Sequence, residues 1–400
     1  GENADYLAVH RIGQNMMRGE RGWFGRDYAR AMQGVDVPNI AHELGQWGAY
    51  PDFDVIKKFT GFIQPGNYEI FRDSAAANGV LEFNKQFAYA SGRFQLACYK
   101  EEIEANLRTP GLGGFQLLDL HDYTGQGTAL VGLLDPFWQE KGYVTADEWR
   151  RFCSKAVLLA SLKQRIFTTA AKLETGVSLA NYGFSQSNTL TAWTIFERNG
   201  KAVTNGFWRS GELGLGRTTL GAISLSLSQL KSPAMYRLHV SLHEGRIPFE
   251  GEGISDFFGL SRWRERYQVL PNDWNFWLYP AQVSVEAGKD VFVTSSWNDA
   301  EKKLVAGGKV LFLPRNADLD WSSPPLDNLP VFWNRLMNPQ WGRMLGLWCD
   351  TNHPALAGFP TEANCDWQWT QITKGTRAVN IGKLPRELKP IVAAIDDWNR

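Results

Sequence analysis

The chain has 400 residues, of which 44% are hydrophobic and 21% are charged, and this length exceeds what one compact core usually holds. Its 42 basic side chains balance 42 acidic ones, so no overall charge attracts nucleic acid or an anionic membrane. No run of about 18 apolar residues is present, and the sequence therefore predicts no membrane span. We expect two or three domains and no polyanionic partner.

Residues 1–165 alternate short apolar runs with helical stretches, which is typical of a barrel or an open α/β sheet. Residues 37–43 predict a buried strand that ends in polar side chains. Residues 94–107 have helical spacing, and Thr109-Pro110-Gly111 predicts the end of that helix. Residues 114–122 predict the next strand, which gives the order strand, helix, strand.

The predicted secondary structure changes twice along the rest of the chain. Residues 166–245 alternate strands with turn signals, including a hairpin turn at 198–201, and predict a small antiparallel sandwich. Residues 246–285 are rich in loop formers and are interpreted as a connector. From 286 to 400 the alternation of strands and helices returns and predicts a second α/β domain.

Tryptophan is unusually frequent, with 17 among 400 residues, many of them beside amide or charged side chains. Residues 272–277 (Asn-Asp-Trp-Asn-Phe-Trp) and 366–369 (Asp-Trp-Gln-Trp) are examples. An indole ring stacks on the apolar C–H face of a pyranose, while planar polar groups bind the hydroxyls. The composition favours a carbohydrate ligand, although any single Trp more often fills a core.

Glu43 is the strongest candidate for chemistry. In an α/β barrel the catalytic groups lie at the C-terminal ends of the strands, and Glu43 ends the strand predicted at 37–43. Gly45, Gln46 and Trp47 follow it, so a bend, an amide and an indole accompany the carboxylate. Cleavage of a glycosidic bond needs a carboxylate together with donors and an aromatic platform. The alternative is a salt-bridged strand terminus without a catalytic role.

Residues 38–47 (Pro-Asn-Ile-Ala-His-Glu-Leu-Gly-Gln-Trp) resemble the seventh barrel strand of family-two glycoside hydrolases of the β-galactosidase-like type. In that family the Glu at the strand end is the nucleophile. Residues 114–123 and the glycine-rich stretch 125–138 resemble the eighth strand and its loop. The two motifs occur in the order that the family requires.

The resemblance implies a fold for the whole chain. Residues 1–165 would form the C-terminal half of a (β/α)₈ TIM barrel, and residues 166–245 an immunoglobulin-like sandwich. Residues 286–400 would form a glutamine-amidotransferase-like domain without amidotransferase chemistry, because neither Cys349 nor Cys365 lies in a nucleophile elbow with a His partner. That domain is interpreted as structural or assembly-forming.

The resemblance also implies a retaining exo-β-glycosidase that acts on β-galactoside-like or related plant and bacterial glycans, with Glu43 as nucleophile. The ligand would be an oligosaccharide or a polysaccharide side chain, with no cofactor and no metal, and a periplasmic or secreted location is favoured. The residues expected to bind the sugar are His42, Trp47, Asp119, His121, Asp122, Gln126 and Trp138.

One part of the family pattern is missing. The general acid/base of this family is a Glu in an Asn-Glu pair at the end of the fourth strand, and no Asn-Glu dipeptide precedes Glu43. Retaining hydrolysis needs two carboxyl groups about 5–5.5 Å apart, of which the chain is expected to supply one. The chain is therefore a fragment, an enzyme completed by a missing N-terminal half or a homo-oligomer partner, or a non-catalytic carbohydrate-binding or assembly module.

We expect no catalytic role for the other charged and sulfur-containing side chains. Glu101, Glu102 and Glu104 are expected to form the solvated face of a helix, as charge runs on helices usually do. The four cysteines lack any CxxC or Cys/His spacing, so neither a zinc site nor a dense disulfide framework is predicted. No phosphate-binding loop motif joins a strand to a helix, and nucleotide chemistry is not indicated.

Overall fold

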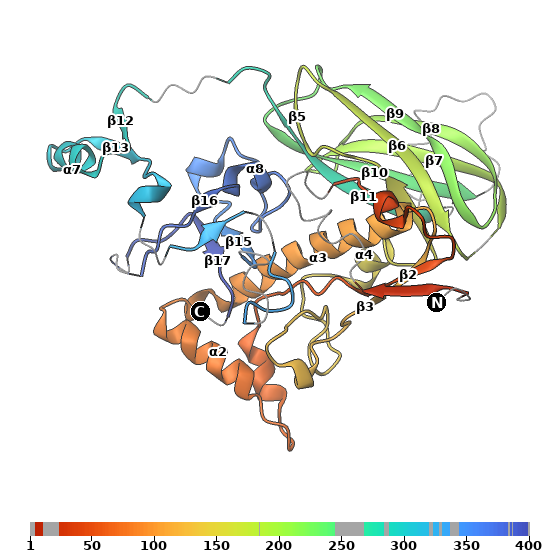
Figure 1. Cartoon of the computed structure of the whole chain (residues 1–400). Coiled ribbons are helices and arrows are strands. Elements are labelled where there is room, and N and C mark those ends of the chain that lie inside the picture. Colours follow the sequence, from red (N-terminus) through yellow and green to blue (C-terminus); the bar gives the residue numbers. More distant parts are fainter. Residues whose placement is uncertain are drawn as a thin grey trace.

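The computed structural model describes residues 5–10, 24–183, 185–244, 268–283, 288–319, 323–327, 330–336, 344–382, 385 and 387–398. Figure 1 shows a sheet with helices in the first part of the chain, a large green β-sandwich and a blue C-terminal part. No helix in these ranges combines the length and the apolar character that crossing a bilayer requires.

The first part of the chain contains a three-stranded parallel sheet. Its strands in spatial order are β1 (Leu7–His10), β2 (Asn39–Leu44) and β3 (Leu112–Leu117). Two helices, α2 (Gly66–Ala77) and α3 (Asn84–Arg108), connect β2 to β3. This confirms the predicted order of strand, helix and strand. The described residues form a half-barrel sheet, and a closed TIM barrel is not seen in them.

Helix α3 ends where the sequence predicts. Thr109 has an extended backbone with a ψ of 123°, because the ring of Pro110 disfavours helical geometry in the residue before it. The Thr109 side chain then accepts a hydrogen bond from Tyr28 N at 2.7 Å and donates one to Ala105 O at 2.7 Å. The end of the helix is thereby fixed against the segment that leads into the sheet.

The prediction of a solvated face on α3 is wrong. Glu101, Glu102 and Glu104 have exposed fractions of only 1%, 2% and 0%. The helix packs between the half-barrel sheet and the β-sandwich, so this face of α3 meets protein instead of water (Figure 1). A charge run indicates a solvated face only when nothing of opposite charge packs on it, and here basic side chains do.

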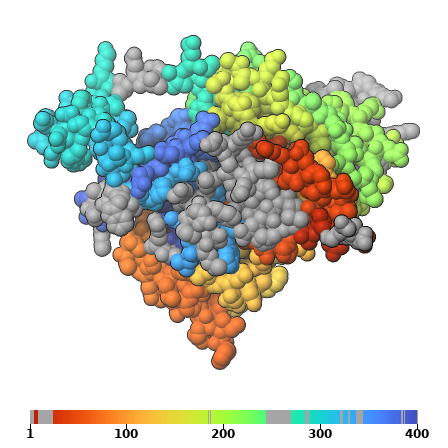
Figure 2. Space-filling model, in the orientation of Figure 1, coloured from red at the N-terminus to blue at the C-terminus, as the bar shows by residue number. Residues whose placement is uncertain are grey.

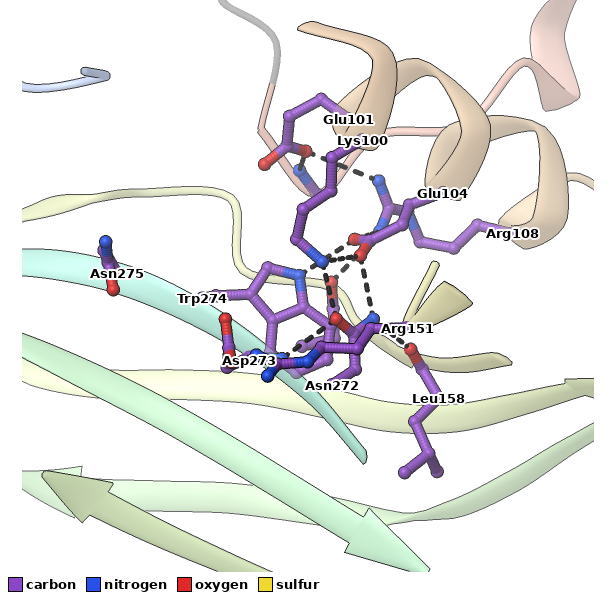
Figure 3. Close-up of polar contacts among 12 residues, drawn as sticks. Lys100, Glu101, Glu104, Arg108, Arg151, Leu158, Asn272, Asp273, Trp274 and Asn275 are labelled. Carbon is purple, nitrogen blue, oxygen red and sulfur yellow. Dashed lines mark hydrogen bonds and ion pairs between the residues drawn. The ribbon is translucent and has the colours of Figure 1, made fainter. Parts of the chain in front are cut away.

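These buried charges form a network between α3 and the sandwich (Figure 3). Glu104 forms ion pairs with Lys100 and with Arg108, the latter at 3.2 Å. It also accepts hydrogen bonds from Asn272 Nδ2 at 2.9 Å and from Trp274 Nε1 at 2.8 Å. Burial alone would raise the pKa of Glu104, but the two positive charges outweigh it and hold the pKa below its usual value. The network joins the two parts of the molecule.

The middle of the chain is an antiparallel β-sandwich, as predicted, in which β5 is the one described strand that pairs in parallel. One sheet has the order β5-β11-β10-β7-β8 and the other the order β4-β6-β9. The strand bounds are β4 (Ala156–Ala160), β5 (Ile166–Thr168), β6 (Lys172–Asn181), β7 (Gln186–Glu197), β8 (Ala202–Leu213), β9 (Gly216–Ser226), β10 (Ala234–Glu244) and β11 (Gln268–Tyr279). The hairpin predicted at 198–201 joins β7 to β8, with Gly200 at a φ of 86°.

The sandwich takes strands from both sides of the range 166–245. Strand β4 precedes it and is buried along its whole length. Strand β11 lies within the predicted connector 246–285, so that part of the prediction is wrong. Its residues Trp274, Phe276 and Leu278 pack in the sandwich core, and Trp277 packs in a second core. Asn272, Asp273 and Asn275 lie among these aromatic residues, and such polar side chains favoured the interpretation as a loop. Residues 246–267 of the predicted connector lie outside the described residues.

The last part of the chain differs from the predicted α/β domain. Strands β12 (Val291–Thr294) and β13 (Lys309–Phe312) pair in parallel around α7 (Trp297–Val305). The other described strands pair only two by two, β14 (Pro325–Leu326) with β16 (Thr376–Arg377) and β15 (Gly346–Cys349) with β17 (Val392–Ile395). No continuous sheet of the amidotransferase-like kind is formed by residues 288–319, 323–327, 330–336 and 344–398 as far as they are described.

This last part shares its core with the half-barrel instead. Phe332, Met344 and Leu347 belong to the same buried cluster as Trp47 and Tyr99. In Figure 2 the blue surface of the last part adjoins the orange surface around α2, while the β12–α7–β13 unit projects to one side. The described strands of this part are short and pair only two by two, while its apolar side chains pack against the half-barrel. The remaining helices in the described ranges are α4 (Ala146–Arg150), α8 (Trp369–Thr373) and short 3₁₀ turns at Ala29–Met32, Phe53–Lys58, Leu81–Phe83, Thr124–Gln126, Asn316–Asp318 and Pro354–Leu356.

Candidate active site

Glu43 lies in a β-bulge at the C-terminal end of β2. The register between β2 and β3 shifts between Ala41 and Leu44, so that His42 and Glu43 together face one residue of β3. Glu43 has a φ of 54°, in the left-handed region that residues other than glycine rarely adopt. Bulges re-aim side chains and are frequent at barrel rims next to active sites, and such backbone strain clusters at functional positions. The carboxylate of Glu43, carried by this strained backbone, is the centre of the candidate site.

Among the described residues, Gln46 and His42 both contact the carboxylate of Glu43. Gln46 Nε2 donates a hydrogen bond to Glu43 Oε2 at 3.0 Å, and His42 Nε2 lies 3.7 Å from Glu43 Oε1. The other ring nitrogen of His42 forms a hydrogen bond of 2.6 Å with Gln116 Oε1, which ties the ring to β3. The Glu43 side chain remains 28% exposed. It is therefore oriented by the protein and still accessible to a ligand.

A glycine turn brings Gln46 back to Glu43. Gly45 has a φ of 96°, and a Cβ at this position would overlap the ring of the buried Tyr99. Gln46 has a φ of 64°, so three of the four residues from Glu43 to Gln46 have a positive φ, and Leu44 is the exception. The sequence Glu-Leu-Gly-Gln places the donor on the carboxylate because glycine permits this close turn.

Asp119 brings a second carboxyl group to the same edge of the sheet. Leu44 of β2 pairs with Leu117 of β3, and Asp119 follows two residues later. Partial burial raises the pKa of Asp119, the negative charges of Asp122 and Glu43 raise it further, and His121 acts in the opposite direction. The structure thus places Glu43 and Asp119, which the sequence predicted separately as nucleophile and sugar-binding group, at the same end of two neighbouring strands.

An aromatic surface follows β3. The ring of His121 stacks on the indole of Trp138, with centroids 4.2 Å apart and planes inclined by 20°. Trp138 is 60% exposed and has a φ of 63°. Tyr123, which is 52% exposed, makes an edge contact with His121 at 6.5 Å. An exposed indole held by a stacked ring has the geometry of a platform for a sugar face.

Other predicted sugar-binding residues are placed differently. Trp47 is fully buried and donates from Nε1 to Glu102 Oε2 at 2.8 Å, so it does not face a ligand. Asp122 is 4% exposed and accepts from Gly132 N at 2.9 Å and from Lys141 Nζ at 2.8 Å. Burial raises the pKa of Asp122, against the charge of Lys141. These two side chains support the site from within, because their polar atoms already have protein partners.

Gln126 ends the turn Thr124–Gln126, and its Oε1 is buried without a hydrogen-bond partner among the described residues. It is half-buried and lies in the loop between Tyr123 and Trp138. The part of the chain that is described places no group of three or more His, Cys, Asp or Glu side chains where it could hold a metal ion.

The structure adds a segment that the sequence analysis missed. Residues 330–334 run beside the turn after β2, where Trp333 N donates to Gln46 O at 2.7 Å and Gly48 N donates to Val331 O at 3.1 Å. The rings of Phe332 and Trp47 meet edge to face at 6.2 Å. No local signal connects these two stretches, because residues 48 and 330 lie 282 positions apart (330 − 48) in the sequence. The last part of the chain therefore supports the turn that carries Gln46.

Two family models match parts of the chain. Residues 171–280 match a domain of unknown function, DUF8488, and residues 292–400 match a second one, DUF8487. The first range coincides with most of the sandwich and includes β11, and the second begins at β12. No curated protein matches the sequence.

Several solved structures resemble parts of the chain. A β-D-mannosidase from Dictyoglomus thermophilum is 12% identical, with a TM-score of 0.35, and the match covers 71% of this chain and 32% of that one. An exo-chitosanase from Amycolatopsis orientalis is 14% identical, with a TM-score of 0.30, covering 50% of this chain and 19% of that one. A β-glucuronidase from Parabacteroides merdae is 11% identical, with a TM-score of 0.19, covering 31% and 14%. The chain thus spans a third or less of the length of these glycosidases, and TM-scores below 0.5 carry no conclusion about function.

Proposed function

We propose that the chain is a retaining exo-β-glycosidase in which Glu43 attacks the anomeric carbon of the sugar. The observation that carries this proposal is the bulge at the end of β2, where an accessible carboxylate is held in a strained backbone by Gln46. A nucleophile must be ionised and aligned before the reaction, and a donor that holds one carboxylate oxygen aligns the other. The resemblance of residues 38–47 to the nucleophile strand of family-two glycoside hydrolases supports the same role.

The proposed ligand is an oligosaccharide or a polysaccharide side chain with a β-linked terminal sugar. Trp138 would provide the platform for the apolar face of the ring, beside His121. A β-galactoside preference comes from the family resemblance alone, and a β-glucuronide or β-mannoside fits the site equally well. His42 and Gln126 are retained in this proposal as groups that bind hydroxyls.

The proposed enzyme needs more than the half-barrel provides. The Asn-Glu acid/base of the resembling family has no counterpart in this sequence, so proton transfer requires a carboxyl group from another position or another polypeptide. No described strand pairs with the outer edges of β1 and β3. We therefore include in the proposal a partner, either an N-terminal half or a second copy of the chain, that covers these edges.

A non-catalytic carbohydrate-binding or assembly module is the second candidate. The exposed aromatic surface of Trp138 and Tyr123 favours it, because such a surface binds sugar whether or not a carboxylate reacts. The two candidates differ in the effect of Glu43→Gln. This change removes the nucleophile but keeps nearly the same shape, so an enzyme loses turnover while a binding module keeps its affinity.

The test is hydrolysis of a panel of nitrophenyl β-glycosides, with Glu43→Gln and Glu140→Gln as matched variants. Glu140 is exposed and lies near the aromatic loop, so its substitution controls for a general loss of charge. We expect turnover of at least one sugar, loss of that turnover in Glu43→Gln only, and release of the β-anomer first by NMR. Turnover that survives in Glu43→Gln, or release of the α-anomer first, would contradict the proposal.

A further inference from the structure

We propose that the loop of residues 59–65 is a second carbohydrate-binding surface, on which the backbone of a polysaccharide lies while the candidate site cleaves the terminal sugar of a side chain. This inference rests on the proposed glycosidase function and narrows its ligand from glycosides in general to sugars attached to a polymer. The loop joins the turn Phe53–Lys58 to α2, and in Figure 1 it forms the orange tip below α2. The ring of Phe62 is the proposed platform.

Two apolar side chains at the tip of the loop face water. Phe62 is 99% exposed and Ile63 is 57% exposed, so neither side chain packs in a core of the described residues. Burial of an aromatic ring is favourable because it removes a large apolar surface from water. A phenyl ring that the fold leaves fully exposed is therefore available to a ligand with an apolar face, such as a pyranose ring.

Contacts on both sides of the tip fix the loop against the segment that follows β3. Before the tip, Phe59 meets Phe137 edge to face, with ring centroids 4.8 Å apart. After the tip, Asn67 Nδ2 donates a hydrogen bond of 2.7 Å to Gly127 O. A loop that is held at both ends presents its exposed ring in one place, which lowers the entropy that binding costs.

The anchoring contacts lie on either side of Trp138, the proposed platform for the terminal sugar. Phe59 contacts the residue before Trp138, and Lys58 Nζ donates to the residue after it, at Gln139 Oε1, over 2.8 Å. Phe62 is three residues beyond Phe59, so its Cα lies at most about 11 Å from that of Phe59. The two exposed aromatic side chains thus belong to loops that are joined by direct contacts.

Both loops follow the end of the half-barrel sheet that carries Glu43. The loop 59–65 comes after β2 and Trp138 comes after β3, and these two strands are parallel neighbours. The C-terminal ends of parallel strands form one edge of the sheet, and this is the edge at which barrels bind their ligands. A single polymer that contacts both loops is thereby placed beside the candidate site.

The chemistry of the loop favours a neutral polymer of sugars. Residues 59–67 (Phe-Thr-Gly-Phe-Ile-Gln-Pro-Gly-Asn) contain no charged side chain, and the hydroxyl of Thr60 and the amide of Gln64 flank the exposed pair. Nucleic acids and anionic membranes attract clustered basic side chains, which this stretch lacks. A stable protein interface buries about 800 Å² on each partner, whereas two exposed apolar side chains supply only a small part of it. Stacking rings with neutral polar neighbours are instead the groups that bind pyranoses.

The experiment compares two substrates that end in the same sugar, in the wild-type chain and in Phe62→Ala. One substrate is the nitrophenyl glycoside, and the other is arabinogalactan or a β-mannan, chosen by the sugar that the wild-type chain releases. We expect kcat/KM for the polysaccharide to fall about two- to ten-fold in Phe62→Ala, because ring stacking is lost, and kcat/KM for the nitrophenyl glycoside to stay unchanged. Phe62→Tyr should retain activity on the polymer. Leu215→Ala, at a 70% exposed position in the sandwich, is the control that should change neither value.

A second readout does not depend on turnover. Retardation of Glu43→Gln in a native gel that contains the polysaccharide measures binding, and the added change Phe62→Ala should reduce it. Equal changes on both substrates, equal retardation with and without Phe62, or an altered oligomeric state of Phe62→Ala in analytical ultracentrifugation would overturn this assignment while leaving Glu43 as nucleophile. Failure of the proposed function itself looks different, since the wild-type chain would then hydrolyse neither substrate, and the claim that the loop assists cleavage would fall with it.

Discussion

Gln46 Nε2 donates a hydrogen bond of 3.0 Å to Glu43 Oε2, and both residues have a left-handed backbone, with φ values of 64° and 54°. Gln46 itself is 2% exposed, and its carbonyl oxygen accepts from Trp333 N. The donor is therefore fixed by the core and by the last part of the chain. The orientation of the proposed nucleophile therefore depends on Gln46, in the first part of the chain, and on Trp333, in the last part.

Substitution of Gln46 by Leu should weaken catalysis more than stability. The Glu43 carboxylate would lose its donor, and a hydrogen bond to a charged group contributes about 1.5–3 kcal/mol, which corresponds to about a 10- to 150-fold loss in kcat/KM. Steady-state kinetics on the preferred glycoside measures this loss. Gln139→Leu, at an exposed position, is the control. An unchanged kcat/KM in Gln46→Leu would mean that this hydrogen bond does not orient the nucleophile.

Gly45→Ala should destabilise the fold far more than Gly79→Ala. Both glycines have positive φ values, 96° and 71°, so both substitutions incur about 1–2 kcal/mol of left-handed strain. Only at Gly45 does the new Cβ also overlap the ring of Tyr99, which is fully buried, whereas nothing lies near the Cβ at Gly79. Urea unfolding monitored by tryptophan fluorescence measures the difference. Equal losses at the two positions would argue against this packing of the turn.

Trp138→Ala should weaken sugar binding without loss of stability. The indole is 60% exposed and stacks on His121, so its removal opens no core cavity but deletes the proposed platform. Aromatic stacking contributes about 0.5–1.5 kcal/mol, and we expect the Kd measured by calorimetry to rise about two- to ten-fold. Trp297→Ala, at a similarly exposed position on α7, should leave the Kd unchanged. Equal effects of the two substitutions would remove the reason for placing the ligand on Trp138.

Glu104→Gln should strongly destabilise the contact between α3 and the sandwich. The change leaves Lys100 and Arg108 buried without their shared anion, and breaking a buried ion pair costs about 3–5 kcal/mol. Asp147→Asn, whose side chain is 90% exposed, should cost less than about 1 kcal/mol. The free energy of unfolding in urea measures both.

The lowered pKa of Glu104 also determines how the stability of the fold should depend on pH. The pKa of Glu104 is lowered in the fold, so its contribution is fully present above the pKa of an unfolded glutamate and is lost as the pH falls through the folded pKa. The wild-type chain should therefore lose stability in acid more steeply than Glu104→Gln. Parallel acid profiles of the two proteins would show that the charge on Glu104 does not stabilise the network.

Local patterns were enough to predict some of these features and could not predict others. The apolar run before Glu43, the helical spacing of α3 and the stop at Pro110 each depend on neighbouring residues, and the structure confirms them. The burial of Glu104 depends on Asn272, which lies in a strand that the sequence assigned to a connector.

Trp47 illustrates the same limit within the site. Its position beside Glu43 in the sequence indicated a sugar platform, but the ring of Phe332 and the carboxylate of Glu102 enclose it. The placement of Glu43 and Asp119 at the ends of neighbouring strands likewise required the pairing of β2 with β3, which no single strand specifies. Contacts between distant segments decide which of the candidate side chains face a ligand.

The most direct test of the central claim is intact mass spectrometry after incubation with a panel of 2-fluoro β-glycosyl fluorides. A fluoride leaves with little protonation, so the reagent tests the nucleophile even where the acid is impaired. We predict a mass increase of one fluorosugar, mapped by peptide sequencing to Glu43 and absent in Glu43→Gln. A folded protein that gains no sugar from any panel member, or gains it at another residue, would contradict the assignment of Glu43 as nucleophile.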